Sequence, residues 1–337
     1  MRKLIIVTKK WGRNFTGATL ATQYFTERWI EHFDSVSVYT LLCGDAIKHQ
    51  NLTVNQFKSE YELGRRLAHD AREIKSTKQY TCYSDDHLGF LFSLADLPYI
   101  HTYHGNWPEA KYISPEFYLK SFYFIPLYKW TISRAKYVIN VSEYMQRFTK
   151  KYNQKSIVIH NGIECKPQDD EVPADSCFLM VGNVDQRKYG YAIKVLEKLN
   201  QMGSGAKVDI FGKILDPKVA EKLRLLPNVS LHGAVKNIPY LKYSGLINTS
   251  KMENLSISVC EAIKNNIPVF CFDVGGLSEV VLSGKTGYVF PAFDIAAMAK
   301  CIFEYSNFGI KLNVDTSVLH DFDWEIAADR YLEVFSR

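Results

Sequence analysis

The feature that most constrains the fold of this chain is the alternation of short apolar segments with longer amphipathic ones. Residues 4–8, 36–41 and 137–141 have the length and composition of buried strands. Residues 60–75 have the charged, periodic pattern of a helix that packs one face against a sheet. Strands that alternate with helices predict a parallel sheet covered by helices, so we expect an α/β fold.

The length of the chain predicts more than one such sheet. A chain of 337 residues is longer than a single hydrophobic core usually supports. The polar segment 165–176 contains two prolines and a cluster of acidic residues, which is typical of a linker. Strand-like segments resume after it, at 177–181 and 207–211. We therefore predict two Rossmann-like, doubly wound domains, residues 1–165 and 177–315, that face each other across a cleft.

The two predicted domains differ in charge. Residues 1–165 contain 22 Lys and Arg against 15 Asp and Glu, whereas the remainder contains 19 against 21. A basic domain favours phosphate, nucleic acid or an anionic membrane as a partner, or it serves solubility alone. The seven cysteines include no C-x-x-C pair, and the first apolar run is too short for a signal peptide. We therefore expect a cytoplasmic protein.

Three features of the first domain could carry chemistry. Gly17 directly precedes a predicted helix, where it lets the backbone approach an anion, although an ordinary turn has the same pattern. His104 ends a predicted strand and can hydrogen-bond a polar substrate or fill a structural role. With His101 it has the spacing of a metal pair, but no third ligand is close in the sequence. Asp85 and Asp86 could form a catalytic pair, but a helix N-cap with a solvated neighbour is the favoured interpretation.

The second domain has two pairs of charged candidates. Arg187 and Lys188 follow its first predicted strand, where they can neutralise a diphosphate or be a solvated pair. Glu253 and Glu261 form an E-x7-E pattern around the start of a helix that we expect to begin near Ser256. A buried carboxylate is costly without a partner, and carboxylates accept hydrogen bonds from the vicinal diols of sugars. We therefore expect ligand hydroxyls, rather than protein cations, to balance these two acids.

Several motifs recur in a fixed order along the chain. They are T-G-A before the first helix, T-Y-H-G, V-S-E-Y-M, I-H-N-G-I-E, V-G-N-V-x3-K, E-x7-E, P-V-x4-V-G-G-L-S-E-V-V and G-x-T-G-Y-V-F. In these motifs the chain resembles the retaining GT-B glycosyltransferases of family 4. The resemblance implies the GT-B fold and a last helix, at 320–337, that crosses back to the first domain.

The resemblance also implies roles for individual residues. His104 would contact the donor sugar near the reacting carbon, and Glu253 would bind the sugar hydroxyls, so these two are the catalytic candidates. The family usually has arginine where this chain has Asn183, which leaves Arg187 to replace it as a diphosphate clamp or to point to solvent. The implied donor-binding residues are Gly17, Asn183, Arg187 and Lys188 at the diphosphate, the backbone of Asn254, Leu255 and Ser256, and Glu261 at the ribose.

We therefore expect an enzyme that transfers a hexose or N-acetylhexosamine from a nucleoside-diphosphate sugar, foremost a UDP-sugar. The acceptor would be a glycan or a lipid-linked molecule in cell-surface polysaccharide synthesis. We expect no metal, no cofactor and no nucleic-acid partner, since the nucleotide-sugar is itself a substrate. The alternative is a non-catalytic, glycosyltransferase-like subunit that binds glycan or stabilises a partner, which only Asn183 favours.

The basic first domain suggests where the acceptor is met. Segment 117–130 interleaves aromatic residues with lysines, which is typical of a membrane-surface helix. We expect the first domain to dock on the inner face of an anionic membrane. For the segment itself, a helix buried against the sheet is the slightly favoured alternative.

Overall fold

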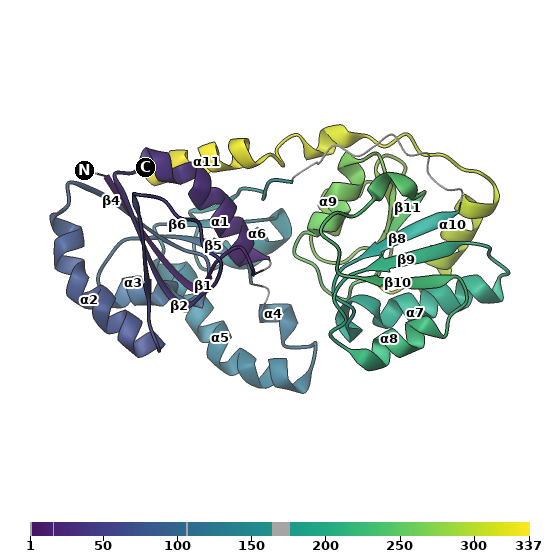
Figure 1. Cartoon of the computed structure of the whole chain (residues 1–337), viewed down its shortest axis with the longest axis horizontal. Helices are drawn as coiled ribbons and strands as arrows, with labels where there is room; N and C mark the ends of the chain where they lie inside the picture. Colours follow the sequence, from purple (N-terminus) through teal and green to yellow (C-terminus); the bar gives the residue numbers. More distant parts are fainter. Residues whose placement is uncertain (1, 16, 106, 164–175) are drawn as a thin grey trace. The chain divides into compact units, whose positions relative to one another are not determined.

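The structure, a computed structural model, confirms the predicted α/β fold (Figure 1). It divides the chain into two compact units: unit 1 comprises Met1–Gly162 and Asp321–Arg337, and unit 2 comprises Ile163–His320. Apart from Ser176, the predicted linker lies outside the described residues. The described residues are 2–15, 17–105, 107–163 and 176–337.

Unit 1 is built on one sheet of seven parallel strands in the order β3-β2-β1-β4-β5-β6-β7. The strand order reverses beside β1, because β2 and β3 lie on one side of it and β4 to β7 on the other. The strands are β1 (Arg2–Trp11), β2 (Ser35–Cys43), β3 (Leu52–Gln56), β4 (Gln79–Ser84), β5 (Ile100–Tyr103), β6 (Tyr137–Asn140) and β7 (Ser156–Val158).

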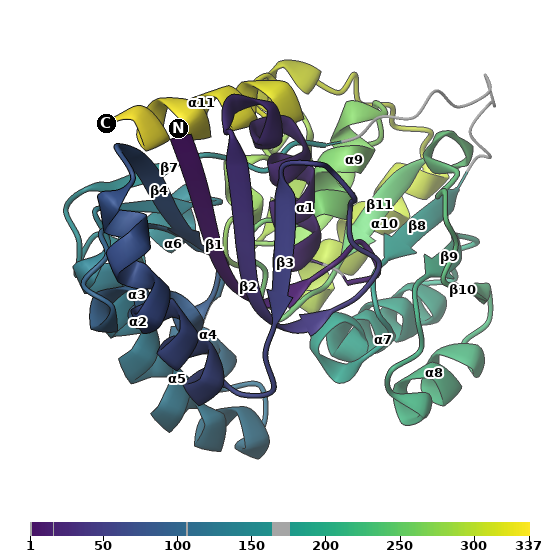
Figure 2. The same cartoon turned by 60° about the vertical axis from the view of Figure 1, so that its left-hand side comes forward.

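Helices cover both faces of this sheet (Figure 2). The apolar side chains of β1 alternate between two hydrophobic clusters, one with α2 and α5 and the other with α1 and α11. The helices are α1 (Ala18–Trp29), η1 (Ile30–His32), α2 (Glu60–Ser76), η2 (His87–Gly89), α3 (Phe90–Leu94), α4 (Trp107–Ala110), α5 (Pro115–Arg134), α6 (Glu143–Thr149) and α11 (Trp324–Ser336).

The last helix, α11, packs on α1 through aromatic rings. Tyr331 lies 4.6 Å from Phe25 and 5.1 Å from Trp29 between ring centroids, and its hydroxyl is 3.0 Å from that of Thr102 in β5. Such contacts between large buried rings are among the strongest apolar interactions in a core. The C-terminal helix is therefore an integral layer of unit 1.

Helix α5 is the clearest disagreement with the buried helix that we expected at 117–130. Only its inner side, including Tyr128 and Ile132, is buried. The outer side exposes Leu119 and Phe122 to 70% and 67%, respectively, and Tyr118 to 50%. The prediction was wrong because apolar density alone does not show which side of a helix meets the sheet.

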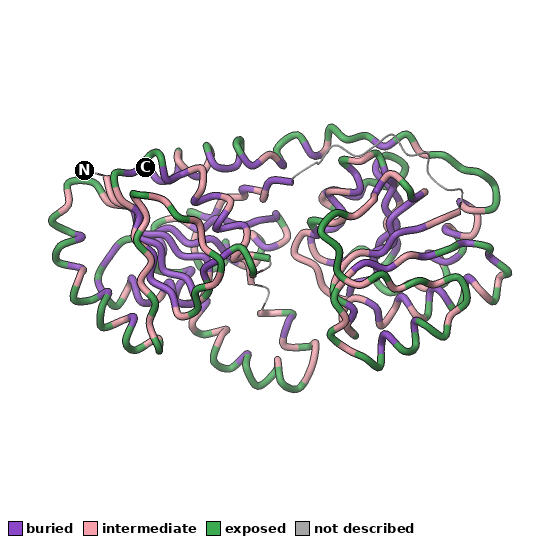
Figure 3. Tube along the Cα trace, in the orientation of Figure 1, coloured by how far each residue is buried: buried purple, intermediate pink, exposed green. Residues whose placement is uncertain are grey.

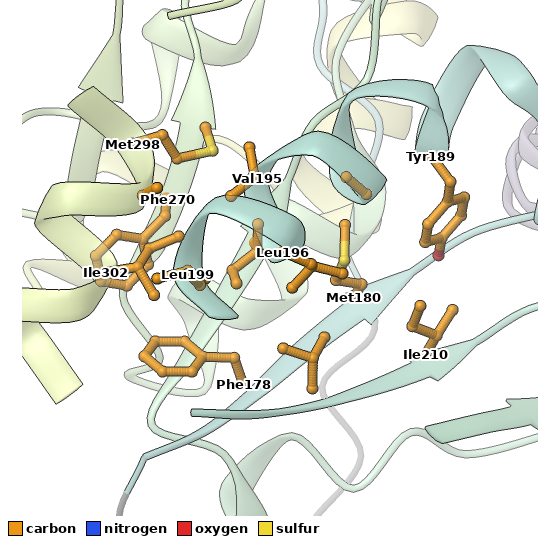
Figure 4. Close-up of a cluster of buried hydrophobic side chains, with 14 of the residues drawn as sticks. Phe178, Met180, Tyr189, Val195, Leu196, Leu199, Ile210, Phe270, Met298 and Ile302 are labelled. Carbon is orange, nitrogen blue, oxygen red and sulfur yellow. The ribbon is translucent and has the colours of Figure 1, made fainter. Parts of the chain in front are cut away.

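Unit 2 repeats the same plan with six parallel strands in the order β10-β9-β8-β11-β12-β13. Figure 4 shows its core, where side chains of β8 such as Phe178 and Met180 pack against Val195 and Leu199 of α7. The elements are β8 (Cys177–Val181), α7 (Gln186–Gln201), β9 (Lys207–Phe211), α8 (Pro217–Arg224), β10 (Val229–Gly233), η3 (Tyr240–Lys242), β11 (Gly245–Asn248), α9 (Ile257–Lys264), β12 (Val269–Phe272), η4 (Leu277–Glu279), β13 (Gly287–Phe290), α10 (Ile295–Asn307) and η5 (Thr316–Leu319).

Burial follows position in each sheet. The central strands are buried over most of their length, whereas the edge strands β3 and β10 are partly exposed (Figure 3). Among the described residues, no helix is long and apolar enough to cross a bilayer. The six described cysteines are free thiols.

Candidate functional site

The strand order of unit 2 reverses between β8 and β11, and the predicted charged residues follow the carboxyl ends of these two strands. Ligands of doubly wound sheets bind at this reversal point, because the loops there diverge and leave room between them. The loop after β8 leads to Lys188, and the loop after β11 leads through Glu253 to the start of α9. These two loops form the candidate site in unit 2.

Lys188 and Glu253 form an ion pair in this site. Lys188 Nζ lies 3.0 Å from Glu253 Oε1, and their side chains are only 15% and 11% exposed. The Ser250 hydroxyl donates to the same carboxylate oxygen over 2.9 Å. Burial by itself would raise the pKa of Glu253, but the charges of Lys188 and Arg187 and the two hydrogen bonds hold it below its ordinary value. The expectation that no protein cation balances Glu253 was therefore wrong.

Two glycines make this geometry possible. Gly182 has φ +138°, and a Cβ there would lie 2.6 Å from Lys188 Cδ, so the lysine chain passes directly over this residue. Gly275 has φ +64°, and a Cβ there would lie 1.6 Å from the Glu253 carbonyl oxygen. The V-G-G motif thus packs its backbone against the loop that carries Glu253.

Arg187 anchors this loop instead of pointing to solvent. Its Nη1 donates to the Met252 carbonyl over 3.1 Å, and the backbone N–H of Lys251 donates to the Arg187 carbonyl over 2.9 Å. The guanidinium side chain is 26% exposed. Asn183, which stands where an arginine was expected, is exposed at the end of β8.

Glu261 lies in α9, where Tyr240 of η3 donates its hydroxyl to Oε2 over 2.6 Å. Sequence reasoning missed Tyr240, since only the fold brings η3 to α9. Ser256 is the N-cap residue of α9, as expected, but its side chain does not cap the helix. Asn254 and Leu255 precede it, so the backbone of all three residues leads into the helix N-terminus.

The candidates of the first domain all lie in unit 1. Gly17 is the N-cap residue of α1 with φ +65°, and a Cβ there would meet no atom within 4 Å, so the space beside it is open. His104 follows β5, and removal from water lowers its pKa to about 4. The same cause lowers the pKa of His101, which is buried against Ser84, to about 3. Both rings are therefore neutral at physiological pH, and no group of three metal-ligating residues occurs in the described part of the chain.

The interpretation of Asp85 and Asp86 as a helix N-cap with a solvated neighbour is correct in part. Asp86 is the N-cap residue of η2, as expected, and accepts hydrogen bonds from the backbone N–H groups of Leu88 and Lys9. Asp85, expected to be solvated, is 3% exposed and accepts a hydrogen bond of 2.6 Å from the Thr22 hydroxyl. The prediction for Asp85 was wrong because α1 covers this end of β4.

A large cavity in unit 2 is not at the candidate site. Its volume is about 580 Å³, and Ser176, Ser244 and Pro268 line it directly before β8, β11 and β12. It therefore lies at the amino edge of the sheet, opposite the edge that carries Lys188. Lys311 is the only charged side chain among the described lining residues, so the cavity lacks the carboxylates that accept sugar hydroxyls at the candidate site.

Comparison with known protein families matches both halves of the chain. Residues 17–166 match the family described as Glycosyltransferase Family 4, and residues 164–307 match Glycosyl transferases group 1. Together the two matches span residues 17–307 and identify the chain as a glycosyltransferase of the family 4 and group 1 type. The two matches join near residue 165, so this glycosyltransferase carries both halves of the family pattern.

Solved structures show the same fold over the full length of this glycosyltransferase. The lipopolysaccharide outer core galactosyltransferase WaaB has 14% identity and a TM-score of 0.75, with 99% of each chain covered. HepE from Anabaena, solved in complex with UDP-glucose, has 17% identity and a TM-score of 0.75, again with 99% of each chain covered. At these identities the likeness establishes the GT-B fold alone.

A curated relative matches at higher identity over a shorter stretch. The poly(glycerol-phosphate) alpha-glucosyltransferase of Bacillus subtilis (strain 168) is 31% identical over 119 residues, or 33% of this chain. The match covers 18% of that relative's length.

Proposed function

We propose that this glycosyltransferase transfers a hexose or N-acetylhexosamine from a UDP-sugar, with retention of configuration, to a glycan or lipid-linked acceptor in cell-surface polysaccharide synthesis. The observation that carries the proposal is the buried Lys188–Glu253 pair at the strand reversal of unit 2. It combines a cation for a diphosphate with a carboxylate for sugar hydroxyls, next to a helix N-terminus. The complex of HepE with UDP-glucose supports the choice of nucleotide.

Each group of the site has a distinct task in this proposal. Lys188 and the N–H groups that begin α9 at Ser256 stabilise the negative charge that grows on the leaving diphosphate. Glu253 accepts hydrogen bonds from the sugar hydroxyls, and Glu261, held by Tyr240, accepts them from the ribose.

In unit 1, His104 and Gly17 are proposed to serve the transfer step. The His104 ring is neutral at pH 7, so it can hydrogen-bond the sugar near the reacting carbon without adding a positive charge. Gly17 leaves its open backbone face to the diphosphate. The leaving phosphate accepts the proton of the acceptor hydroxyl on the face where the new bond forms, so retention requires no carboxylate nucleophile.

The positive charges at the site support a reaction that needs neither metal nor cofactor. Lys188 and the N-terminus of α9 supply positive electrostatic potential where the diphosphate would bind. Arg187 is already engaged by the Met252 carbonyl, and Asn183 supplies no charge, so Lys188 is the main cation of this proposal. Replacing Lys188 should therefore lower donor affinity more than replacing any other residue of the site.

The substitution at Asn183 favours a second candidate function. A subunit that retains the fold but has lost one diphosphate clamp could bind glycan or stabilise an active partner. That candidate predicts no release of nucleotide from any nucleotide-sugar.

The test is a panel of UDP-, GDP- and ADP-sugars. A donor that binds should raise the melting temperature in proportion to its affinity. UDP release is then measured with and without a chelator, and the anomeric configuration of the product is read by NMR. Lys188→Met should abolish donor binding, whereas the exposed Lys300→Met should behave as wild type. Release of UDP that requires magnesium or manganese would contradict the metal-free mechanism, and donor binding without any release would favour the non-catalytic subunit.

The outer face of α5 supports membrane docking, which we also propose. Leu119 and Phe122 are exposed beside Lys120, which pairs with Glu116, and these apolar side chains next to an exposed ion pair suit the interface of a bilayer. This surface would bring unit 1 to a lipid-linked acceptor.

A further inference from the structure

A cavity of about 220 Å³ lies in unit 1 at the point where its own strand order reverses, between β1 and β4. It is the counterpart in unit 1 of the location that holds Lys188 and Glu253 in unit 2. Thr8 and Lys9 border it from β1, and Asp85 and Asp86 border it from the end of β4. In a doubly wound sheet this is the expected position for a ligand.

The polar floor of the cavity contains an oxygen without a partner. Asp85 is 3% exposed, and its Oδ2 accepts the Thr22 hydroxyl. Its Oδ1 has no hydrogen-bond partner of ordinary geometry among the described residues, and the Thr8 hydroxyl, which donates to the Lys10 carbonyl, lies close enough to the carboxyl group to lower its pKa. A buried carboxyl oxygen without a donor is costly, so a ligand hydroxyl that donates to it would remove that cost.

The protonation state of Asp85 also suits a hydroxyl partner. Burial, and then the adjacent charge of Asp86, raises the pKa of Asp85 to about 7. Near neutral pH the carboxyl group is therefore divided between an acceptor-only form and a form that also donates. A hydroxyl, which both donates and accepts, can pair with either form.

Another part of the cavity lining is aromatic. The rings of Trp107 in α4 and Phe124 in α5 stack with centroids 4.4 Å apart and planes at 14°. Such a wall suits the C–H face of a sugar ring or the carbon chain of a polyol. The cavity is smaller than the roughly 300–1,000 Å³ of pockets for drug-sized ligands, so it fits one such unit.

Two cations border the cavity. Lys9 Nζ lies 5.8 Å above the Phe124 ring, and Lys10, which is exposed, lies 5.4 Å from the Phe15 ring. Ammonium groups of this kind bind phosphate as point charges. The cavity therefore combines a hydroxyl-binding floor, an apolar wall and a phosphate-binding border.

We propose that this cavity binds one hydroxyl-bearing unit of the acceptor together with an adjacent phosphate, so that the acceptor is a phosphorylated polyol or sugar. Asp85 pairs with a hydroxyl of that unit, Trp107 packs on its carbon face, and Lys10 pairs with the phosphate. This inference rests on the proposed function for the identity of the ligand as acceptor, but the cavity can be tested without the donor.

The test titrates the full-length protein with glycerol 3-phosphate, glycerol and inorganic phosphate, with binding followed by NMR. Glycerol 3-phosphate should bind at least about tenfold more tightly than either of the other two, since each half adds a charge-assisted or hydroxyl hydrogen bond. Asp85→Asn should weaken its binding by about tenfold, since it alters the hydrogen-bonding group that meets the ligand hydroxyl. Asp96→Asn, a change at a 95% exposed aspartate of the same unit, should have no effect.

Lys10→Gln and Trp107→Leu make the test independent of the buried carboxyl, should Asp85→Asn not fold. Lys10→Gln should weaken the binding of glycerol 3-phosphate but not that of glycerol. Trp107→Leu should weaken the binding of both ligands. UDP-glucose affinity should be unchanged in every variant, because Asp85, Lys10 and Trp107 are not among the residues proposed to contact the donor. Equal binding of inorganic phosphate and glycerol 3-phosphate, or the same affinity in all variants, would overturn the proposal. If the wild-type protein does not bind UDP-glucose, the proposed function is contradicted. The titration with glycerol 3-phosphate still tests the cavity in that case.

Discussion

Lys188 Nζ and Glu253 Oε1 lie 3.0 Å apart at the carboxyl edge of unit 2, and both side chains are largely shielded from water. Each charge is therefore stabilised mainly by the other. A diphosphate that reaches Lys188 would meet a cation whose position is already fixed by Glu253 and Ser250. Because the lysine is pre-positioned, less of the binding energy is lost in ordering its flexible chain.

The pair can be tested through stability. Lys188→Met leaves a mostly buried carboxylate without its cation, and should lower the free energy of unfolding of unit 2 by about 3 kcal/mol. Adding Glu253→Gln should restore most of this loss, because the isolated charge is then gone, without restoring donor binding. Urea unfolding of both single variants and the double variant measures the coupling. Additive losses would show that the two groups do not stabilise each other.

The two glutamates should separate donor binding from turnover. Glu261→Gln should raise KM for the UDP-sugar with little change in kcat, because the ribose is held alike in ground and transition states. Glu253→Gln should mainly lower kcat, because the sugar that it contacts changes charge during transfer. Steady-state kinetics measures both, with the exposed Glu304→Gln as the matched control. Equal effects of both changes on KM alone would contradict this division.

Gly275 should be intolerant of any side chain. Gly275→Ala would place a methyl group 1.6 Å from the Glu253 carbonyl oxygen and at an unfavourable φ, so the Glu253 loop must shift. We expect a lower melting temperature and a loss of donor binding of at least about tenfold, since this loop carries the proposed sugar contact. Gly205→Ala, where a Cβ meets nothing within 4 Å, is the matched control. Unchanged donor affinity in Gly275→Ala would show that the loop position is not needed.

His104 should remain neutral throughout the physiological range. Its pKa is lowered to about 4, so the folded protein binds this proton only below that pH, whereas the unfolded chain binds it near 6.5. Its contribution to stability is therefore complete above about 6.5 and is lost as pH falls towards 4. Asp85, whose pKa is raised, contributes with the opposite sign, so the stability of the whole protein does not isolate His104.

NMR of the imidazole ring measures His104 directly. Its Cε1–H resonance, assigned from its absence in His104→Gln, should keep its chemical shift from pH 8 to pH 5. It should begin to move only near pH 4. A midpoint at the ordinary value for histidine would show that the ring is open to water.

Membrane docking through α5 should depend on its exposed apolar side chains. Phe122→Ser and Leu119→Ser should reduce co-sedimentation with vesicles that contain anionic lipid, since both side chains are lost from the interface. Leu225→Ser, at a 79% exposed leucine of unit 2, should not. Binding of the wild type should fall with salt and should be weak to neutral vesicles. If binding does not depend on vesicle composition, the excess of basic residues in unit 1 serves solubility rather than membrane docking.

Much of the fold could be read from the sequence. Predicted strands 177–181 and 207–211 agree residue for residue with β8 and β9, because each is an apolar run bounded by polar or turn residues. The start of α9 after Ser256 follows an equally local signal. The strands β3 and β13 escaped prediction. β3 lies at a sheet edge, where Thr53, Asn55 and Gln56 interrupt the apolar pattern, and β13 is a strand of only four residues at the edge of the other sheet.

The sequence alone determined the residue types of the candidate site and their place at strand ends, because those depend on local pattern. The tertiary structure decided which residues meet. Tyr240 reaches Glu261 from 21 residues away, and Thr22 reaches Asp85 from 63. It also decided that Glu253 is balanced by Lys188, that Asp85 is buried, and that one face of α5 stays exposed. The physical reason is the same in each case: burial and charge pairing depend on the elements that pack around a residue, and local sequence does not specify those neighbours.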